Sequence, residues 1–303
     1  MKSSSTDAAA TGSAPTAGEP APLAAPARAP APPRAGNTSP GPPGVRGRGA
    51  RQASSWLIPA TVVIVIIGLW QLLVDVLGLK PYFIPSPWRV VVTFEESFGE
   101  ITSSCVPTIS QAVVGFAIGN GLAVIMSIWF VHVSAARRAL YPLAIVLQSI
   151  PLVALAPVAI VTLGNGFTTK VVMTGIISFF PTLVNMMRGL AAVDPNMLQL
   201  FQSVHSSRLQ VLARLRWPMS LPYLFAGLRI TASASMVGAI IVEWISSDTG
   251  LGYMIINSTY QFNTPLLWAS IVAASLLVLA AFGVVVLAER LLVPWARTAK
   301  FGV

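Results

Sequence analysis

Several apolar runs in this chain are long enough to cross a lipid bilayer, and they restrict its fold more than any other feature. About 20 consecutive apolar residues in a helix cover the ~30 Å of hydrocarbon in a bilayer. The 303 residues are 54% hydrophobic and 10% charged, whereas soluble domains carry about a quarter charged residues. Because a backbone in lipid must satisfy its own hydrogen bonds, these runs favour helices. The sequence predicts an all-α integral membrane protein.

Six of these regions are expected to span the membrane. The second contains Gly115, Gly119 and Gly121, which predict a face suited to close helix packing. The third is interrupted by Pro142, Pro151 and Pro157, which predicts a kinked or broken helix. The expected spans are residues 56–77, 106–131, 140–163, 170–187, 221–245 and 266–287.

The charges of the connecting segments indicate the orientation. Arginines concentrate in the tail before the first span, after the second span, in residues 188–229 and at the C-terminal end, whereas residues 80–104 contain Glu95, Glu96 and Glu100. Positive residues accumulate on the cytoplasmic side, so we expect a multi-pass protein of the cell (inner) membrane with both termini in the cytoplasm. The expected parts are a disordered Pro/Ala/Gly-rich tail (1–55), the first helix with an outer loop (56–104), a core (105–295) and a short tail (296–303).

The longest polar interval within the apolar part runs from residue 188 to 229, between the fourth and fifth spans. Asp194 can cap a helix that has Pro195 at its first position. Two short helices are predicted, at 196–204 and 208–217, after which Pro218 and Pro222 are expected to break the chain. The interval is basic and cytoplasmic by the charge argument, which indicates contact with something in the cytoplasm.

The interval contains the motifs Trp217-Pro218, Leu221-Pro222 and Ala226-Gly227-Leu228-Arg229. With these motifs it resembles the coupling loop in the membrane subunits of ATP-binding-cassette (ABC) importers, in the branch for nitrate, sulfonates, taurine and pyrimidine-type vitamin precursors. Two positions depart from the family pattern: Gln199-Leu200-Phe201 stands where Glu-Ala-Ala is expected, and His205 replaces a turn glycine. The matching residues are Arg208, Arg214, Trp217-Pro218, Leu221-Pro222, Ala226-Gly227-Leu228-Arg229, Ile150-Pro151, Ala154-Leu155-Ala156-Pro157, Leu163-Gly164-Asn165-Gly166, Phe179-Phe180-Pro181, Asn185, Gly189-Leu190, Val193-Asp194-Pro195, Glu243 and Gly250-Leu251-Gly252-Tyr253.

The resemblance implies a type I importer permease of six helices, with a cytoplasmic coupling helix between helices four and five. It also implies a separate ABC ATPase subunit that holds ATP and Mg, an extracytoplasmic substrate-binding protein, and a pair of permease copies, for which a homodimer is the natural expectation. The chain itself is expected to bind no cofactor. The residues expected to couple to the ATPase, within loop 188–220, are Gln199, Leu200, Phe201, Ser203, His205, Arg208 and Pro218.

Polar residues within the spans are candidates for a translocation path. Such residues also join helices to one another, and both interpretations stay open. Glu243 could line the path near the outer mouth, or it could be structural, through an ion pair with Lys170 or a hydrogen bond to residues 246–252. The candidate path residues are Asn120, Gln148, Ser178, Asn185 and Glu243.

Other functional classes are poorly supported by the sequence. The net charge of +9 follows from membrane topology rather than nucleic-acid binding. Residues 164–170 lack the glycine before lysine of a phosphate-binding loop, and one cysteine with two distant histidines gives no metal cluster. No catalytic constellation is visible, so an enzyme is not expected. A secondary transporter or channel working without an ATPase is the alternative, although no internal repeat is evident. The substrate is left open, with a lean towards pyrimidine or riboflavin-type solutes.

Overall fold

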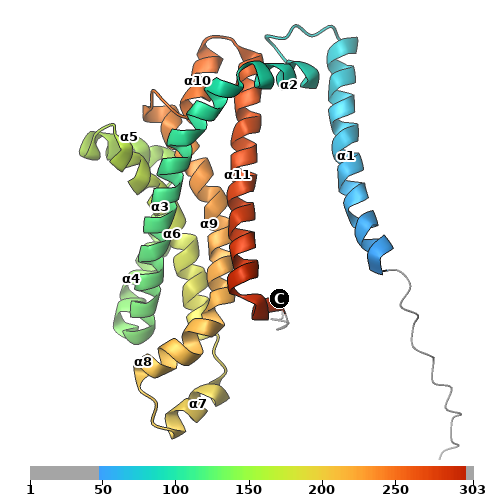
Figure 1. Cartoon of the computed structure of the whole chain (residues 1–303). Coiled ribbons are helices and arrows are strands. Elements are labelled where there is room, and N and C mark those ends of the chain that lie inside the picture. The colour runs from blue at the N-terminus through green and yellow to red at the C-terminus, as the bar shows by residue number, and fades with distance from the viewer. Residues whose placement is uncertain (1–47, 298–303) are drawn as a thin grey trace, which may run out of the picture. The chain divides into compact units, whose positions relative to one another are not determined.

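Every regular element within residues 48–297 of the computed structural model is a helix (Figure 1). The chain divides into two units, residues 1–55 and 56–303. Of the first unit the structure describes only residues 48–55, which form the start of α1 (Arg48–Val76). They were expected to belong to the disordered tail. The remainder of the two predicted tails, residues 1–47 and 298–303, lies outside the described residues.

Five helical stretches in the described chain are long and apolar enough to cross a membrane. They correspond to the first, second, fourth, fifth and sixth predicted spans, and the largest difference at a boundary is an extension into polar sequence. It is at the fifth span, which begins at Arg208 instead of residue 221, and the second span likewise begins at Phe98 instead of residue 106. The stretches are Ile58–Val76 within α1, α3 (Phe98–His132), α6 (Phe167–Ala191), Arg208–Ser246 and α11 (Thr264–Leu292).

The third predicted span is broken, as its prolines indicated. It consists of α4 (Ser134–Gln148) and α5 (Leu152–Leu163), and Pro151 is the N-cap of α5. With 15 and 12 residues, neither helix alone has the length of a span. The five long stretches and the α4–α5 pair thus correspond to the six predicted regions, and the predicted interruption of the third region is confirmed.

The centre of the bundle is formed by α3, α6 and α9 (Trp217–Ser246), which lie side by side (Figure 1). α11 packs along α9. Where α5 meets the bundle, Ala156 packs with Met173 of α6 and Val242 of α9. α4 instead packs near the opposite end, where Leu140 and its neighbours contact Leu183 and Phe130.

Two ten-residue helices that the sequence analysis did not predict, α2 (Pro87–Glu96) and α10 (Leu251–Tyr260), pack at one end of the bundle. We call this the α10 end. Val90 of α2, Ile101 of α3 and Leu251 of α10 share an apolar cluster with α11 residues. A start signal for α2 was present in the sequence, because Ser86 caps it and Pro87 follows.

The opposite end, called the loop end, carries α7 (Pro195–Ser203) and α8 (Arg208–Val211). From α8 the chain continues through a π-helical turn, Leu212–Arg216, directly into α9. The predicted break at Pro218 and Pro222 is therefore wrong. Pro218 lies in the first turn of α9 and has no N–H to donate to the preceding turn. The π turn directly before it has a different hydrogen-bond register, so the helix continues past the proline. α8, the π turn and α9 form one helical stretch of 39 residues.

Close contact between α3 and α6 depends on glycine. A Cβ at Gly115 would lie 2.6 Å from the Thr174 Cβ, and a Cβ at Gly119 would overlap the backbone of Gly175. The predicted small-residue face is thus confirmed for Gly115 and Gly119. Gly121 has no atom within 4 Å of its would-be Cβ and is not part of it.

Gly119→Ala is expected to destabilise the bundle by about 1–2 kcal/mol. Overpacking costs about 1–3 kcal/mol, and the better helix propensity of alanine offsets up to about 1 kcal/mol. Gly121→Ala on the same helix is the matched control and should leave stability unchanged or raise it. Thermal unfolding of the two variants in detergent measures the difference, and equal midpoints would contradict the packing described above.

Candidate functional site

The helix α7 at the loop end begins where the sequence predicts. Asp194 accepts a hydrogen bond from the Asn196 amide at 2.8 Å, and Pro195 occupies the first helical position. The side-chain cap satisfies one of the amides left unpaired at a helix start. The first predicted loop helix is therefore confirmed, with bounds that differ by one residue at each end.

The turn after α7 is built around His205, which has a φ of +54°. The His205 amide donates to the Gln202 carbonyl at 3.0 Å, and the Ser206 amide donates to the Phe201 carbonyl at 3.0 Å. This pair of bonds defines a Schellman motif, whose left-handed position usually holds glycine. The histidine thus adopts the backbone conformation of the turn glycine that it replaces, so the departure from the family pattern keeps the turn.

His205→Gly is expected to stabilise this turn by up to about 1 kcal/mol, because an L-residue in the left-handed region costs about 1–2 kcal/mol and glycine does not, less the entropy that glycine adds to the unfolded chain. Hydrogen exchange at the Ser206 amide should become slower. His205→Ala removes the imidazole but keeps the Cβ, so it should not slow the exchange. Equal protection in both variants would show that the imidazole, and not the backbone, sets the stability of the turn.

An apolar face of α7 is exposed in this chain. Met197, Leu200 and Val204 expose 44%, 57% and 67% of their surface, and α7 contains no buried residue. Their spacing of three and four residues places them on one side of the helix. Among the other residues predicted to couple, Gln199, Ser203, His205 and Arg208 are exposed, whereas Phe201 and Pro218 are half-buried. Six of the seven predicted residues lie on α7, its turn and α8, and Pro218 lies on α9.

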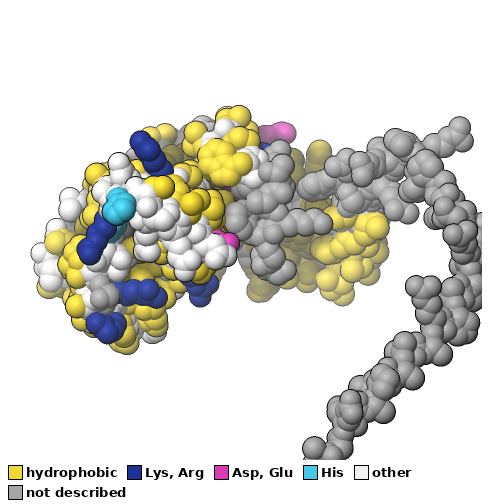
Figure 2. Space-filling view, turned by 90° about the horizontal axis from the view of Figure 1, so that it is seen from below, with side chains coloured by type: hydrophobic (Ala, Val, Ile, Leu, Met, Phe, Trp, Pro, Cys, Tyr) yellow, Lys and Arg dark blue, Asp and Glu magenta, His cyan; other side chains and the backbone are white. Residues whose placement is uncertain are grey.

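The surface at the loop end is basic. Seen from this end, lysine and arginine side chains are distributed over the surface and few acidic side chains are visible (Figure 2). Arg137, Arg138, Arg208 and Arg214 are exposed. Among the described residues the structure contains one salt bridge, and none of these four takes part in it.

Glu243 lies at the opposite, α10 end, completely buried. Its carboxylate accepts hydrogen bonds from the Thr108 hydroxyl at 2.8 and 2.9 Å, from the Gln111 amide and from the backbone N–H of Gly252 at 2.8 Å. The Leu251 amide donates to the Thr108 hydroxyl at 3.0 Å. These five residues, which we call the Glu243 cluster, join α3, α9 and the first turn of α10, where a helix favours negative charge.

Two structural interpretations of Glu243 were open, an ion pair with Lys170 and a hydrogen bond to residues 246–252. The hydrogen bond to Gly252 is of the kind expected with residues 246–252. Lys170 instead donates to the Ser247 hydroxyl at 2.7 Å. A Cβ at Gly252 would lie 2.6 Å from the Glu243 Cβ, so the glycine permits the close approach of α10 to the carboxylate.

The other candidate path residues are dispersed. Asn120 is buried among α3, α6 and α9, where its side-chain oxygen accepts from the hydroxyls of Thr182 and, at 3.1 Å, Thr231. Ser178 is buried and Asn185 half-buried, and both donate to carbonyls of their own helix. Gln148 is exposed at the end of α4. The structure thus does not bring the five candidates together in one cavity.

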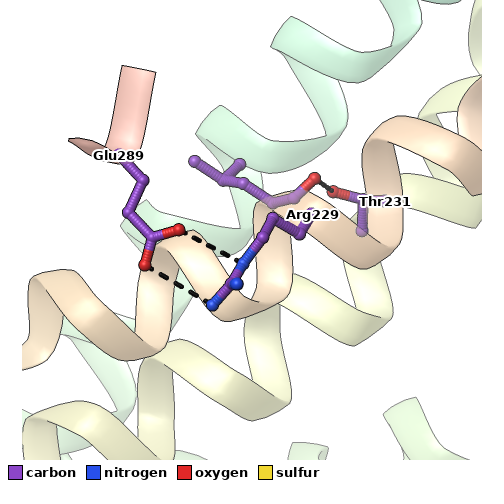
Figure 3. A network of polar contacts seen from close by, with 4 residues as sticks. Arg229, Thr231 and Glu289 are labelled. Atoms are coloured by element: carbon purple, nitrogen blue, oxygen red, sulfur yellow. Dashed lines mark hydrogen bonds and ion pairs between the residues drawn. The ribbon is translucent and has the colours of Figure 1, made fainter. Parts of the chain in front are cut away.

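The sequence analysis missed an ion pair between α9 and α11. Arg229 Nε lies 3.3 Å from Glu289 Oε2, and Arg229 Nη2 donates to Glu289 Oε1 at 3.4 Å (Figure 3). Thr231, two residues along α9, links this region to Asn120. Charged residues within spans usually pair with one another, but the predicted sixth span ended at residue 287 and left Glu289 outside it. The pair attaches α11 to the central helices.

A hollow of about 670 Å³ lies at the α10 end, beside the Glu243 cluster. We call it the α10 hollow. Its lining comes from the start of α3, the segment before α10, α10 itself and the residues after it, and contains no lysine or arginine. The polar side chains on its wall include Glu100, Asp248, Tyr253, Asn257 and Gln261. Within the described residues, no group of three or more His, Cys, Asp or Glu could hold a metal ion.

Comparison with known proteins identifies the fold and its role. Residues 119–298 match the family model "Binding-protein-dependent transport system inner membrane component". The chain is 30% identical to the formylaminopyrimidine transport permease protein of Halalkalibacterium halodurans (80% of this chain, 96% of that one) and 30% to the riboflavin transport system permease protein of Chloroflexus aurantiacus (78% and 89%). It is 25% identical to a putative aliphatic sulfonates transport permease protein of Bacillus subtilis (84% and 93%). This chain belongs to the family of binding-protein-dependent transport system inner membrane components, the membrane permeases of ABC importers.

Proposed function

We propose that the chain is the translocating subunit of an ATP-driven importer, in which a separate ABC ATPase binds α7 in the cytoplasm. An extracytoplasmic binding protein delivers the solute at the α10 end. The chain lies in the cell membrane with both termini inside, α4 and α5 together make the third crossing, and two copies form a homodimer. ATP and Mg belong to the ATPase subunit.

The observation that carries this proposal is the exposed apolar face of α7. Three large apolar side chains on one short, capped helix lie uncovered at a basic surface. Apolar anchors of this kind are typical of a helix that lies in a groove of a partner protein. A secondary transporter, which needs no ATPase, gives no reason for such a face.

The connection from α7 to the α10 end offers a route for the ATPase to move the solute site. The Schellman turn leads to a capping box between Ser207 and Gln210, which fixes the start of α8. From there the helix is unbroken to Ser246, a length of about 58 Å at 1.5 Å per residue. The π turn at Leu212–Arg216 supplies a bending point near its start. Closure of the ATPase would thus tilt α9 and, through the Glu243 cluster, displace α10, giving alternating access.

For the substrate, the α10 hollow favours a neutral or weakly cationic solute that forms hydrogen bonds. Its wall offers carboxylates, amides and a phenol, and no basic side chain that would bind a sulfonate. The two relatives that are 30% identical are described as permeases for formylaminopyrimidine and riboflavin. We therefore propose a heterocyclic vitamin or vitamin precursor as the solute.

The test is purification from native membranes followed by uptake in liposomes. An ABC ATPase subunit should co-purify, and uptake of labelled riboflavin or formylaminopyrimidine should require both the binding protein and ATP on the α7 side. Uptake without ATP would overturn the importer proposal in favour of a secondary transporter. ATP-dependent uptake of an alkyl sulfonate in preference to both heterocycles would overturn only the substrate proposal.

A further inference from the structure

A second hollow, of about 330 Å³, lies at the loop end between the end of α3, α7 and the start of the long Arg208–Ser246 helix. We call it the arginine hollow. Its polar lining comes from His132, Gln202, Ser206, Arg208 and Arg216. No acidic side chain lines it, and within the described residues neither arginine has a carboxylate partner. The volume is in the range of small-ligand sites.

The two arginines are presented differently. Arg216 is half-buried, and its Nη1 donates to the Leu190 carbonyl at 3.1 Å, which fixes the guanidinium at the end of α6 and leaves its other N–H groups available. Arg208 is exposed, at the first position of α8. Each guanidinium offers a planar fork of donors that matches the oxygens of a phosphate. A serine hydroxyl and a glutamine amide add neutral donors.

The remaining lining is apolar. Val131, Leu198 and Val211 contribute it, and Val211 is buried. His132 ends α3, where its Nδ1 lies 2.8 Å from the Ile128 carbonyl, which leaves Nε2 as the second polar atom of the ring. The hollow therefore combines forked cations with apolar walls at the end of a spanning helix. Basic pockets between spans on the cytoplasmic side are where acidic headgroups bind.

From this arrangement we propose that the arginine hollow binds a phosphate anion, carried by the headgroup of an anionic phospholipid or present as free phosphate. The bound phosphate bridges Arg208 and Arg216 and contacts α7 through Gln202. It thereby holds α7 against the end of α3, so the ligand sets the position of α7. The proposal depends on the described contacts alone and does not require the ATPase.

The full-length chain is purified in detergent, stripped of lipid and studied by native mass spectrometry and thermal unfolding. Phosphatidylglycerol is compared with phosphatidylcholine, and inorganic phosphate is added in a third arm. Wild-type protein should retain phosphatidylglycerol and gain thermal stability from it, and should not respond to phosphatidylcholine. Arg208→Gln should bind it about tenfold more weakly, as expected for the loss of a charge-assisted contact.

Arg214→Gln is the matched control, because Arg214 is exposed on the same segment and does not line the hollow. It removes the same charge and should bind phosphatidylglycerol as the wild type does. Arg208→Lys should recover only part of the affinity, since it restores the charge without the fork. Stabilisation by inorganic phosphate that depends on Arg208 would support the site with free phosphate as its ligand. Equal losses in Arg208→Gln and Arg214→Gln, or no Arg208-dependent response to either phosphatidylglycerol or inorganic phosphate, would overturn it.

Discussion

Replacing Leu200 by aspartate is expected to weaken binding of the ATPase subunit by at least about 100-fold and to abolish ATP-dependent uptake. Leu200 exposes 57% of its surface in this chain and lies within the apolar face of α7. Burial of a leucine contributes about 1.5–3 kcal/mol, and an unpaired carboxylate in a desolvated groove adds a further cost. Because each 1.4 kcal/mol is a factor of ten in affinity, a loss of about 3 kcal/mol or more gives the stated factor. Co-purification and surface-based binding assays measure it.

Leu209→Asp is the matched control for this experiment. It introduces the same charge in place of the same side chain, at a position that is 72% exposed and lies on α8 instead of α7. We expect it to leave most ATPase binding intact. If the two variants lost binding equally, the contact would extend over the whole loop, and the assignment to one face of α7 would be wrong.

The features that the sequence predicted are those determined by residues close together in the chain. The long apolar runs predicted the five helical stretches of spanning length. The prolines of the third region predicted the break between α4 and α5, and Asp194-Pro195 predicted the start of α7. Each depends on hydrophobicity, on the missing N–H of proline or on a local cap. Gly115 and Gly119 were also recognisable, because a spacing of four residues places them on one helical face.

The features that could not be predicted depend on contacts between distant parts of the chain. Glu243 is separated from Thr108 by 135 residues, and Arg229 from Glu289 by 60, so nothing local indicates either pair. The continuity across Pro218 was missed for another reason. Its missing N–H normally ends a helix, and the π turn that allows the helix to continue has no signature in the sequence.

These contacts give the two ends of the long helix different characters. At Arg208 it begins in an exposed, basic segment held by a capping box, where a partner can bind. At Glu243 it ends in a buried set of hydrogen bonds that attaches α10. The importer mechanism proposed above requires that the Arg208 end of the helix can move with the ATPase and that the Glu243 end is firmly attached to α10. The strength of the Glu243 cluster therefore decides whether a movement at α7 can reach the α10 hollow.

Glu243→Ala is accordingly expected to destabilise the protein by about 3–5 kcal/mol, because it leaves the buried Gln111 amide and Gly252 N–H without an acceptor and the Thr108 hydroxyl with only the Ser104 carbonyl, at 3.3 Å. Glu243→Gln keeps the volume but replaces one acceptor oxygen with a donor, so it should cost about 1–3 kcal/mol. Thermal unfolding in nanodiscs measures the stabilities of the two variants, and the unfolding midpoint should be lower for Glu243→Ala than for Glu243→Gln. Gln148→Ala, at an exposed polar residue, is the control and should unfold as the wild type does.

Thr108→Val and Gly252→Ala test the same cluster without changing the charge of Glu243. The first removes the hydroxyl that joins the carboxylate to the Leu251 amide, and the second places a methyl group 2.6 Å from the Glu243 Cβ. If the cluster is structural, both should lower stability and uptake together with Glu243→Gln. If instead Glu243→Gln unfolds like the wild type but fails to transport, while Thr108→Val and Gly252→Ala transport normally, the carboxylate acts on the solute itself and is a residue of the translocation path.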